Sequence, residues 1–436
     1  MYWGAGGEPA GDTTIFDRSI SQMRGFIDKS SKTWKIEAYA NGGHPQTQME
    51  LEKVFQPRQL RGNISADHLE KQIADYKNKI ERGEIKPGDK ILLIIATHGY
   101  QNRGEKSHSI STNSGAAQTE SFNLDELKQI TELAESKKIK LGIIDLSCHS
   151  GGSLPLANSA TCIISSSGPT QYATGSFAEN FLDRLQPGKS LESIFLETRR
   201  SSASPAFPMI STPAGQSVNQ KLYSKIQLYL NWPGAWERND HFLESLLSRA
   251  TCPRAPEAFS KLEDEIRTIA AQLGVKSPSI DRLLELMRHY DKKQRDAASA
   301  LAAWGVKDLN QNESISQPDG TVVSESRLNL LTTPYGDRVN DLSSRLESET
   351  DPSKRDRLQL LKEHYESRIQ LRAQLLERAP QLSNVASKYK ALLNQLDLSQ
   401  SQANEIALEE RELYDALYRE DSGKNTGPNP CRDFVL

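Results

Sequence analysis

The sequence predicts an α/β domain with a mostly parallel sheet over residues 1–232, followed by an all-α helical bundle over 233–436. Two apolar runs carry the first part of this prediction. Ile91–Ala96 and Leu141–Leu146 are rich in Ile and bounded by turn residues, which is typical of strands buried on both faces of a parallel sheet. Strand signals nearly vanish after about Trp232, where apolar residues recur at helical spacing instead. A chain of 436 residues is long enough for two or three such units.

The first half alternates between helix and strand patterns, as an α/β domain requires. The polar stretch between the two apolar runs, residues 101–121, is expected to be a long loop rich in Ser, Asn and Gly. The other expected elements are a helix capped near Thr13 or Thr14, a strand over 34–40, a helix from Ser65, a helix over 124–137, a strand over 161–166, helices over 177–185 and 191–198, and a short edge strand over 207–211.

The second half shows apolar residues three and four positions apart, the spacing of one helix face. These stripes are too broken for one long coiled coil, so we expect an antiparallel bundle. Residues 307–320 are expected to form a polar linker, and 421–436 show no periodicity. The expected helical stretches cover 259–273, two segments within 280–304, then 339–346, 358–376, 385–396 and 406–417.

Charge and hydropathy exclude some classes of function. The net charge of -3 implies no global attraction to nucleic acid or to an anionic membrane. No apolar run approaches the roughly 18 residues of a membrane span, so none is expected. Residues 1–7 lack the basic and apolar regions of a signal peptide, and instead resemble a strand end running into a glycine turn. We leave the location open, with export or a periplasmic location as the alternative if an upstream signal segment is missing.

The four cysteines contain no CxxC pair, so we expect neither a structural zinc site nor any other metal or cofactor. Cys148 ends an apolar run and is a candidate catalytic residue. Cys162 opens an apolar run and is expected to be a buried strand residue. Cys252 and Cys431 each adjoin a proline; two unrelated free thiols are favoured, with a disulfide between them as the alternative in an exported protein.

Each apolar run breaks into a reactive side chain, His98 after the first and Cys148 after the second. Catalytic groups of open α/β sheets lie just beyond the carboxyl ends of such strands, so both residues are expected at one sheet edge. A nearby imidazole or helix dipole favours the thiolate, the reactive form of cysteine. We therefore predict Cys148 as nucleophile and His98 as acid/base. The backbone N–H groups of Gly99 and Cys148 are the predicted oxyanion hole.

Each residue also has a structural interpretation. A lone His at a strand end is usually a polar terminator, and a lone Cys in an apolar run is usually part of a core. Two such residues, each near glycine at the ends of neighbouring strands, favour the catalytic interpretation. His149 competes less well, because its side chain should point away from Cys148. The remaining histidines lie in polar loops or on expected helices.

Thr97-His98-Gly99 and Ser147-Cys148-His149-Ser150-Gly151 resemble the two hallmark motifs of the caspase-like cysteine peptidases (clan CD), closest to the legumain, caspase and clostripain group. The separation of 148 − 98 = 50 residues is similar to that of the caspase His and Cys. The resemblance implies a caspase-like α/β/α sandwich and peptide hydrolysis through a thioester by a dyad. It covers roughly residues 1–230 and extends to Gly6–Pro9, Ile163–Ser167, Gln171–Ala173 and Phe177–Phe181.

The position two residues before the cysteine departs from the family pattern. Legumain and caspases carry a polar residue there that helps to form the S1 pocket, whereas this chain has Leu146. Asp145 is one residue further back and should face the other side of the sheet. The resemblance therefore implies no Asn, Asp or Arg preference, and a small or apolar P1 residue is our expectation. Leu146 and Ser166 are the predicted substrate-binding residues.

The leading functional hypothesis is a cysteine endopeptidase acting on a protein or peptide substrate, with a helical domain that regulates it or binds a protein partner. One alternative is a helical partner-binding protein that uses an inactive peptidase fold as scaffold. The other is a transpeptidase, because a dyad alone does not distinguish attack by water from attack by an amine. The basic pair Arg199-Arg200 is a candidate processing site, with a solvated surface pair as its competing interpretation.

Overall fold

A computed structural model describes the chain except residues 5–15, 31–32, 41–44, 102–107, 114–118, 174, 203, 205, 231–255, 276, 304–308, 310, 317–321, 351, 386, 389–390, 392–399 and 425–426. The chain divides into two compact units. Unit 1 comprises Met1–Asn231, Ala270–Ser279 and Ala407–Leu436, and unit 2 comprises Trp232–Ile269 and Ile280–Ile406. The predicted boundary at 232 matches the first crossing between the units. The prediction that everything beyond it forms one separate domain is wrong, because the C-terminal segment belongs to unit 1.

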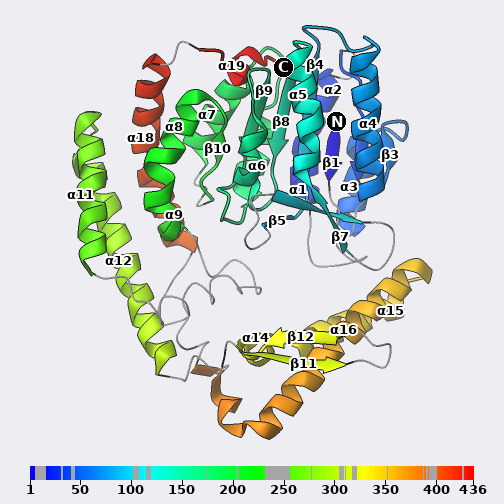
Figure 1. The fold of residues 1–436 in the computed structure, drawn as a ribbon. Coiled ribbons are helices and arrows are strands. Elements are labelled where there is room, and N and C mark those ends of the chain that lie inside the picture. The colour runs from blue at the N-terminus through cyan, green and yellow to red at the C-terminus, as the bar shows by residue number, and fades with distance from the viewer. Residues whose placement is uncertain are drawn as a thin grey trace. The chain divides into compact units, whose positions relative to one another are not determined.

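Unit 1 is built on a seven-stranded, mostly parallel sheet, so the predicted α/β class is correct (Figure 1). The strand order is β10-β9-β8-β4-β1-β2-β3, and only β10 pairs antiparallel, at the edge where a short strand was predicted. The long Ile-rich strands β4 and β8 lie side by side at the centre. The strands are β1 (Tyr2–Gly4), β2 (Ala38–Ala40), β3 (Leu60–Gly62), β4 (Lys90–Ala96), β8 (Lys140–Asp145), β9 (Thr161–Ser165) and β10 (Met209–Ile210).

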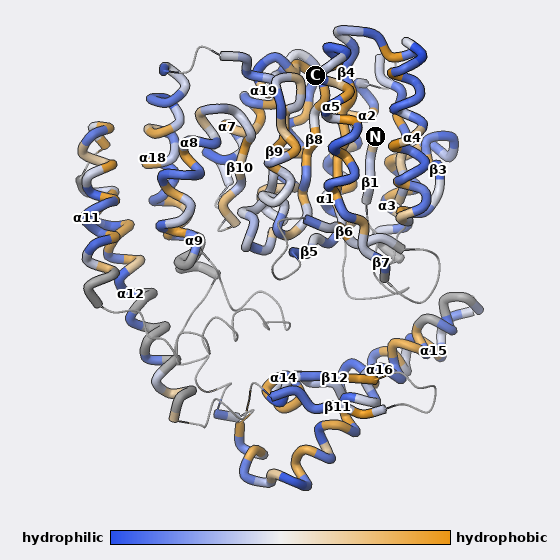
Figure 2. Tube along the Cα trace, viewed as in Figure 1, coloured by the Kyte–Doolittle hydropathy of each residue, from blue (hydrophilic) through white to orange (hydrophobic). Residues whose placement is uncertain are grey.

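Helices cover both faces of this sheet, which gives three layers. On one face, alternate residues of β4 and β8 form a hydrophobic core with apolar side chains of α4 and α5. Figure 2 shows the apolar central strands flanked by helices with mixed faces. The first face carries α4 (Ala66–Glu81), η1 (Leu124–Leu127), α5 (Lys128–Ser136) and η2 (Ser150–Leu156); the other helices of this part are α1 (Asp17–Gln22), α2 (Arg24–Ser30), α3 (Pro45–Val54), α6 (Gly175–Asp183), α7 (Leu191–Ser201), α8 (Pro213–Val218), the π-helix η3 (Asn219–Tyr223) and α9 (Ser224–Leu230).

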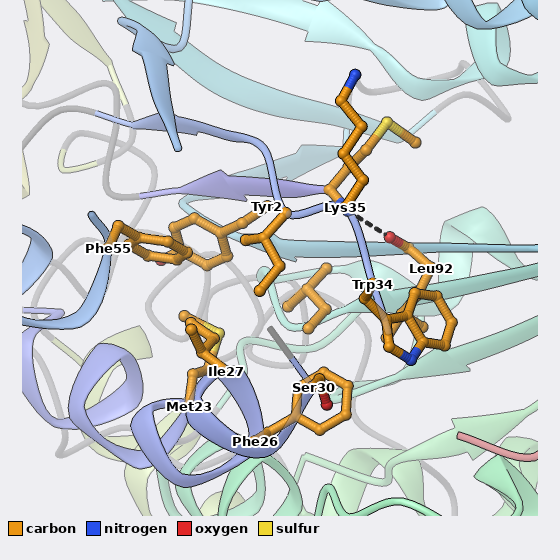
Figure 3. Close-up of a pocket in the computed structure, with 12 residues that line it drawn as sticks. Tyr2, Met23, Phe26, Ile27, Ser30, Trp34, Lys35, Phe55 and Leu92 are labelled. Carbon is orange, nitrogen blue, oxygen red and sulfur yellow. Dashed lines mark hydrogen bonds between the residues drawn. The ribbon is translucent and has the colours of Figure 1, made fainter. Parts of the chain in front are cut away.

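An apolar pocket lies between the sheet and α2 on the second face (Figure 3). Its lining includes Tyr2 from β1, Phe26 from α2, and Trp34 and Phe55 from neighbouring segments. Polar atoms contribute almost nothing to its surface, and neither predicted catalytic residue lines it. We interpret it as a gap in the packing of the hydrophobic core.

The stretch predicted as a long loop instead contains a second, antiparallel sheet. Its strands are β5 (Gly99–Gln101), β6 (His108–Asn113) and β7 (Thr119–Asn123), with β6 in the middle. Ile110 and Phe122 lie opposite each other and are buried in the main core, which anchors this sheet. The polar composition hid this pattern, because polar residues occupy most of the remaining positions.

The C-terminal tail completes unit 1. Helix α18 (Gln400–Lys424) is followed by α19 (Pro430–Asp433), and Cys431 of α19 forms a disulfide with Cys162 of β9. Cys162 is a buried strand residue as predicted. The predictions of a free Cys431 or of a Cys252–Cys431 bond are both wrong, although Cys252 itself lies outside the described residues. Phe434 is fully buried, so the tail without periodicity is an integral part of the core.

Ion pairs join α18 to α7. The guanidinium of Arg199 donates to both carboxylate oxygens of Glu410 at 3.0–3.2 Å, and both side chains are buried. The same guanidinium lies 3.6 Å from the ring centroid of Tyr414, a cation–π contact. Arg200 pairs with Asp415 at 2.7 Å. Because Arg199 is buried and paired, the Arg199-Arg200 pair is not the accessible processing site proposed from the sequence.

Unit 2 is mostly helical, but it is not the predicted all-α bundle. A hairpin of β11 (Asn312–Ser316) and β12 (Val322–Ser326) begins within the predicted polar linker and packs against α16. Buried Glu313 on β11 explains the attachment, because it pairs with Arg327 at 2.7 Å and with Arg378 of α16 at 2.6 Å. The helices are α11 (Pro256–Gln272), α12 (Ser277–Ala302), α14 (Arg327–Thr332), α15 (Tyr335–Ser348), α16 (Pro352–Arg378) and η4 (Pro380–Asn384). Among the described residues, no helix is long and apolar enough to cross a membrane.

Candidate active site

The central strands bring the His98 and Cys148 segments to the same sheet edge. Strands β4 and β8 pair in parallel, with Ile95 opposite Asp145 at their carboxyl ends. The N–H of Leu146 extends this pairing by donating to the Ile95 carbonyl at 2.9 Å. His98 and Cys148 follow these ends by two or three residues, so the placement expected from the sequence is correct.

Gly99 forms the contact between the two turns. A methyl group built on its Cα would lie 2.0 Å from the Cys148 carbonyl oxygen and 2.8 Å from Cε1 of His108. No side chain fits there, because the first of these atoms is backbone. The backbone N–H groups of Ala173 and Gly99 lie near the Cys148 sulfur and act to lower the pKa of its thiol. The Gly99 donor predicted for an oxyanion hole thus lies beside the nucleophile itself.

Cys148 is partly buried and carries a free thiol, the only one among the described cysteines. Burial raises the pKa of this thiol to about 11, since a buried thiolate loses its hydration. The two N–H donors act in the opposite direction by stabilising the thiolate, and the charge of Asp145 adds a smaller upward contribution. The resting side chain is therefore the protonated thiol.

His98 is held by the antiparallel sheet. Its carbonyl accepts from the Ser111 N–H at 2.8 Å, and the Thr97 hydroxyl donates to the Ser111 carbonyl at 3.1 Å. The half-buried imidazole packs edge-on against the ring of Phe16, with centroids 5.4 Å apart. Strand β6 therefore fixes the backbone that carries the predicted acid/base.

The turn after Cys148 is sharp. His149 adopts a left-handed conformation with φ of 61°, uncommon for a residue with a side chain. Its N–H donates to the Gln171 carbonyl at 2.7 Å, and its ring packs against Tyr172 with centroids 5.1 Å apart. The segment that contributes the Ala173 N–H is thereby tied to the nucleophile turn.

The two predicted substrate-binding residues lie beside the turn but offer little surface. Leu146 is 7% exposed and belongs to the core, while Ser166 is fully buried. The Ser166 hydroxyl donates to the Ser147 carbonyl at 3.3 Å and so supports the turn from β9. In this conformation Ser166 lines no open cleft, because its hydroxyl is already used within the protein.

A buried polar network beneath the turn was missed by sequence reasoning. Asp145 is fully buried, and its carboxylate accepts from the Ser147 N–H at 3.1 Å, the Ser147 hydroxyl at 2.6 Å and the Ser153 hydroxyl at 3.0 Å. Nε2 of His108 lies 3.1 Å from the same carboxylate. His108 was placed in a polar loop, and only its position on a β-strand could have revealed the pairing.

Ser147, His108 and Asp145 do not form a second catalytic triad. A triad histidine uses one ring nitrogen for the serine and the other for the carboxylate. Here Nε2 faces both the Ser147 hydroxyl, at 3.0 Å, and the Asp145 carboxylate. All three side chains are at most 2% exposed, so no substrate reaches the hydroxyl. The network supports the cysteine turn instead.

Across the described parts of both units, no group of three or more His, Cys, Asp or Glu side chains is arranged to hold a metal ion. No protein-family model matches the chain, and no curated protein matches it significantly. Assignment of a function therefore depends on the geometry of the site.

Proposed function

We propose that this protein is a cysteine endopeptidase of the caspase-like type, with His98 and Cys148 as its dyad. The observation that carries the proposal is the close approach of Gly99 to the Cys148 backbone, because it brings the two turns together at the carboxyl edge of the sheet. Strained backbone beside the nucleophile and N–H donors around its sulfur are features of sites built for acyl transfer.

The proposed reaction starts from the protonated thiol. As the sulfur attacks the scissile carbonyl carbon, His98 takes the thiol proton. The carbonyl oxygen becomes an oxyanion, stabilised by N–H groups of the Gly99 and Cys148 turns. His98 then protonates the leaving amine as the C–N bond breaks, which leaves a thioester on Cys148. Water hydrolyses the thioester, releases the carboxylic acid and restores the thiol.

Substrate binding has a defined task in this scheme. In the resting state the N–H groups of Ala173 and Gly99 favour the thiolate of Cys148, whereas an oxyanion hole must present its donors to the substrate oxygen. On attack the sulfur bonds to the carbonyl carbon, and the carbonyl oxygen becomes the acceptor that these donors face. The donors that hold the resting thiol then stabilise the oxyanion, and Ala173 N–H is a further donor at this position.

The specificity proposal is limited to a small or apolar P1 residue. No charged side chain takes the place of the polar S1 residue of legumain and caspases, because Leu146 stands there and is packed into the core. Asp145 does not substitute for it, since its carboxylate is occupied by Ser147, Ser153 and His108.

The test uses full-length protein with a fluorogenic peptide library, with and without calcium, and a thiol-reactive inhibitor followed by mass spectrometry. We expect cleavage and labelling at Cys148, with loss of cleavage in Cys148→Ala and His98→Ala. His289→Ala, which removes an exposed histidine of unit 2, is the matched control. Absence of both cleavage and labelling in the unmodified protein would contradict the proposal.

Two alternatives give different outcomes. If the protein is a partner-binding scaffold, Cys148→Ala retains the biological role. If it is a transpeptidase, adding an amine nucleophile diverts the acyl group to a new peptide bond, and the hydrolysis product falls in proportion.

A further inference from the structure

The His108 ring sits in a space made by two glycines. A methyl group on Gly99 would lie 2.8 Å from its Cε1, and one on Gly152 would lie 2.8 Å from its Cβ. Only 2% of the residue is exposed. Gly99 belongs to the turn after β4 and Gly152 to η2, so the segments on both sides of the nucleophile lack side chains where His108 enters. The two glycines therefore leave the room that the His108 ring occupies.

Both nitrogens of the ring face acceptors. Nδ1 lies 3.2 Å from the Tyr100 carbonyl oxygen, which can only accept. Nε2 lies 3.1 Å from an Asp145 carboxylate oxygen and 3.0 Å from the Ser147 hydroxyl. The Ser147 hydroxyl already donates to Asp145, so it too is an acceptor toward the ring. Donation to acceptors on both sides requires a proton on each nitrogen, which is the imidazolium form.

We propose that His108 and Asp145 form a buried ion pair that positions the Cys148 turn and neutralises the carboxylate charge beneath the nucleophile. This inference rests on the proposed function for its purpose, since it assigns two positioning residues to the same cysteine. Asp145 fixes the Ser147 N–H and hydroxyl, one residue before Cys148. His108 supplies the positive charge that keeps this carboxylate from opposing the thiolate.

The ion pair and a purely structural role make different predictions for the pKa of Cys148 in His108→Gln and Asp145→Asn. In His108→Gln the Asp145 charge has lost its partner and disfavours the Cys148 thiolate, which raises the pKa of the thiol. In Asp145→Asn the negative charge is gone, which lowers that pKa. A purely structural role predicts that this pKa moves in the same direction in both variants, because either change loosens the turn and exposes the thiol. Among the residues that the structure describes, the other titratable groups on the segments around Cys148 are His98 on the β4 turn, His149 on its own turn, and Tyr172 beside Ala173.

The experiment measures the rate of Cys148 alkylation by iodoacetamide against pH in the full-length protein, with the modified residue identified by mass spectrometry. We expect the midpoint of the rate curve to move up in His108→Gln and down in Asp145→Asn, each on the order of one pH unit. His289→Gln, at an exposed site, should leave it in place. Midpoints that move in the same direction, or not at all, overturn the proposal.

A measurement on the unmodified protein covers the case in which a variant fails to fold. Nuclear magnetic resonance of protein labelled with ¹⁵N-histidine should show a solvent-protected ring with an N–H proton on each nitrogen. A protected His108 ring with one N–H proton overturns the ion pair. Neither readout requires peptide cleavage, so an inactive protein can still support this inference, and an active one can still contradict it.

Discussion

The close approach between Gly99 and the Cys148 backbone gives a sharp prediction. In Gly99→Ala the new methyl group would lie 2.0 Å from the Cys148 carbonyl oxygen and 2.7 Å from the Ser147 hydroxyl. An ordinary contact needs about 3.4 Å or more, so one turn must move by about an ångström. Neither side yields easily, because Ser147 is bound to Asp145 and Gly99 is paired with Ile110.

Overpacking of this kind costs about 1–3 kcal/mol. We therefore expect Gly99→Ala to lower the melting temperature of the full-length protein and to shift the Cys148 turn away from Gly99. The consequence for function is larger than the consequence for stability, since a misplacement of about 1 Å reduces catalysis about 100-fold.

The control is Gly25→Ala in α2, where an added methyl group meets nothing within 4 Å. Ala is favoured over Gly in a helix by about 0.5–1 kcal/mol, so this variant should melt at the same or a higher temperature. Both variants are compared by calorimetry, by Cys148 alkylation and by peptide cleavage. If Gly99→Ala matches Gly25→Ala in all three, the two turns do not touch as described.

Three further predictions concern the disulfide of the tail, the buried Arg199–Glu410 pair and the Cys148 thiol. Cys431→Ser removes a crosslink between residues 269 apart and should cost about 2–5 kcal/mol, visible as a lower melting temperature. Addition of reductant should lower the melting temperature of the unmodified protein but not that of the variant. Glu410→Gln leaves Arg199 buried without its counter-charge and should cost about 3–5 kcal/mol, whereas Glu412→Gln, at an exposed position of the same helix, should cost little. Folded Cys148 keeps its proton up to about pH 11, above the ordinary value of 9.0, so alkylation should accelerate toward pH 11. Because the unfolded chain loses that proton first, the free energy of unfolding should fall between pH 9 and 11, a decline that Cys148→Ala lacks.

The central strands and the reactive residues could be predicted because their signals are local. Ile91–Ala96 and Leu141–Leu146 have the composition of doubly buried strands, and a parallel pair places the residues after each strand at one edge. The antiparallel sheet, which lies between these two strands in the sequence, could not be predicted. Only Ile110 and Phe122 reach the core from its strands, which are otherwise polar.

The pairings across the chain were beyond local patterns. Cys162 and Cys431 are 269 residues apart, and no periodicity marks the tail that brings them together. Asp145 was expected to face the side of the sheet opposite Leu146, but strand alternation alone did not reveal that its carboxylate bonds back to Ser147, where the strand ends and the chain turns. The hairpin of unit 2 was missed because Glu313, a residue of low strand propensity, is stabilised by arginines distant in sequence.

The position of the tail sets an order on the folding of newly made chains. Unit 1 is assembled from segments at both ends of the sequence, and the whole of unit 2 is synthesised before Cys431 and Phe434 emerge. A ribosome adds about 5–20 residues per second, so the nascent sheet spends about ten seconds or more without its last helix. During that time β9 exposes the surface that α19 later covers. The proposed peptidase would therefore complete its fold only after unit 2 has been synthesised, which delays the risk of cleaving neighbouring chains until that point.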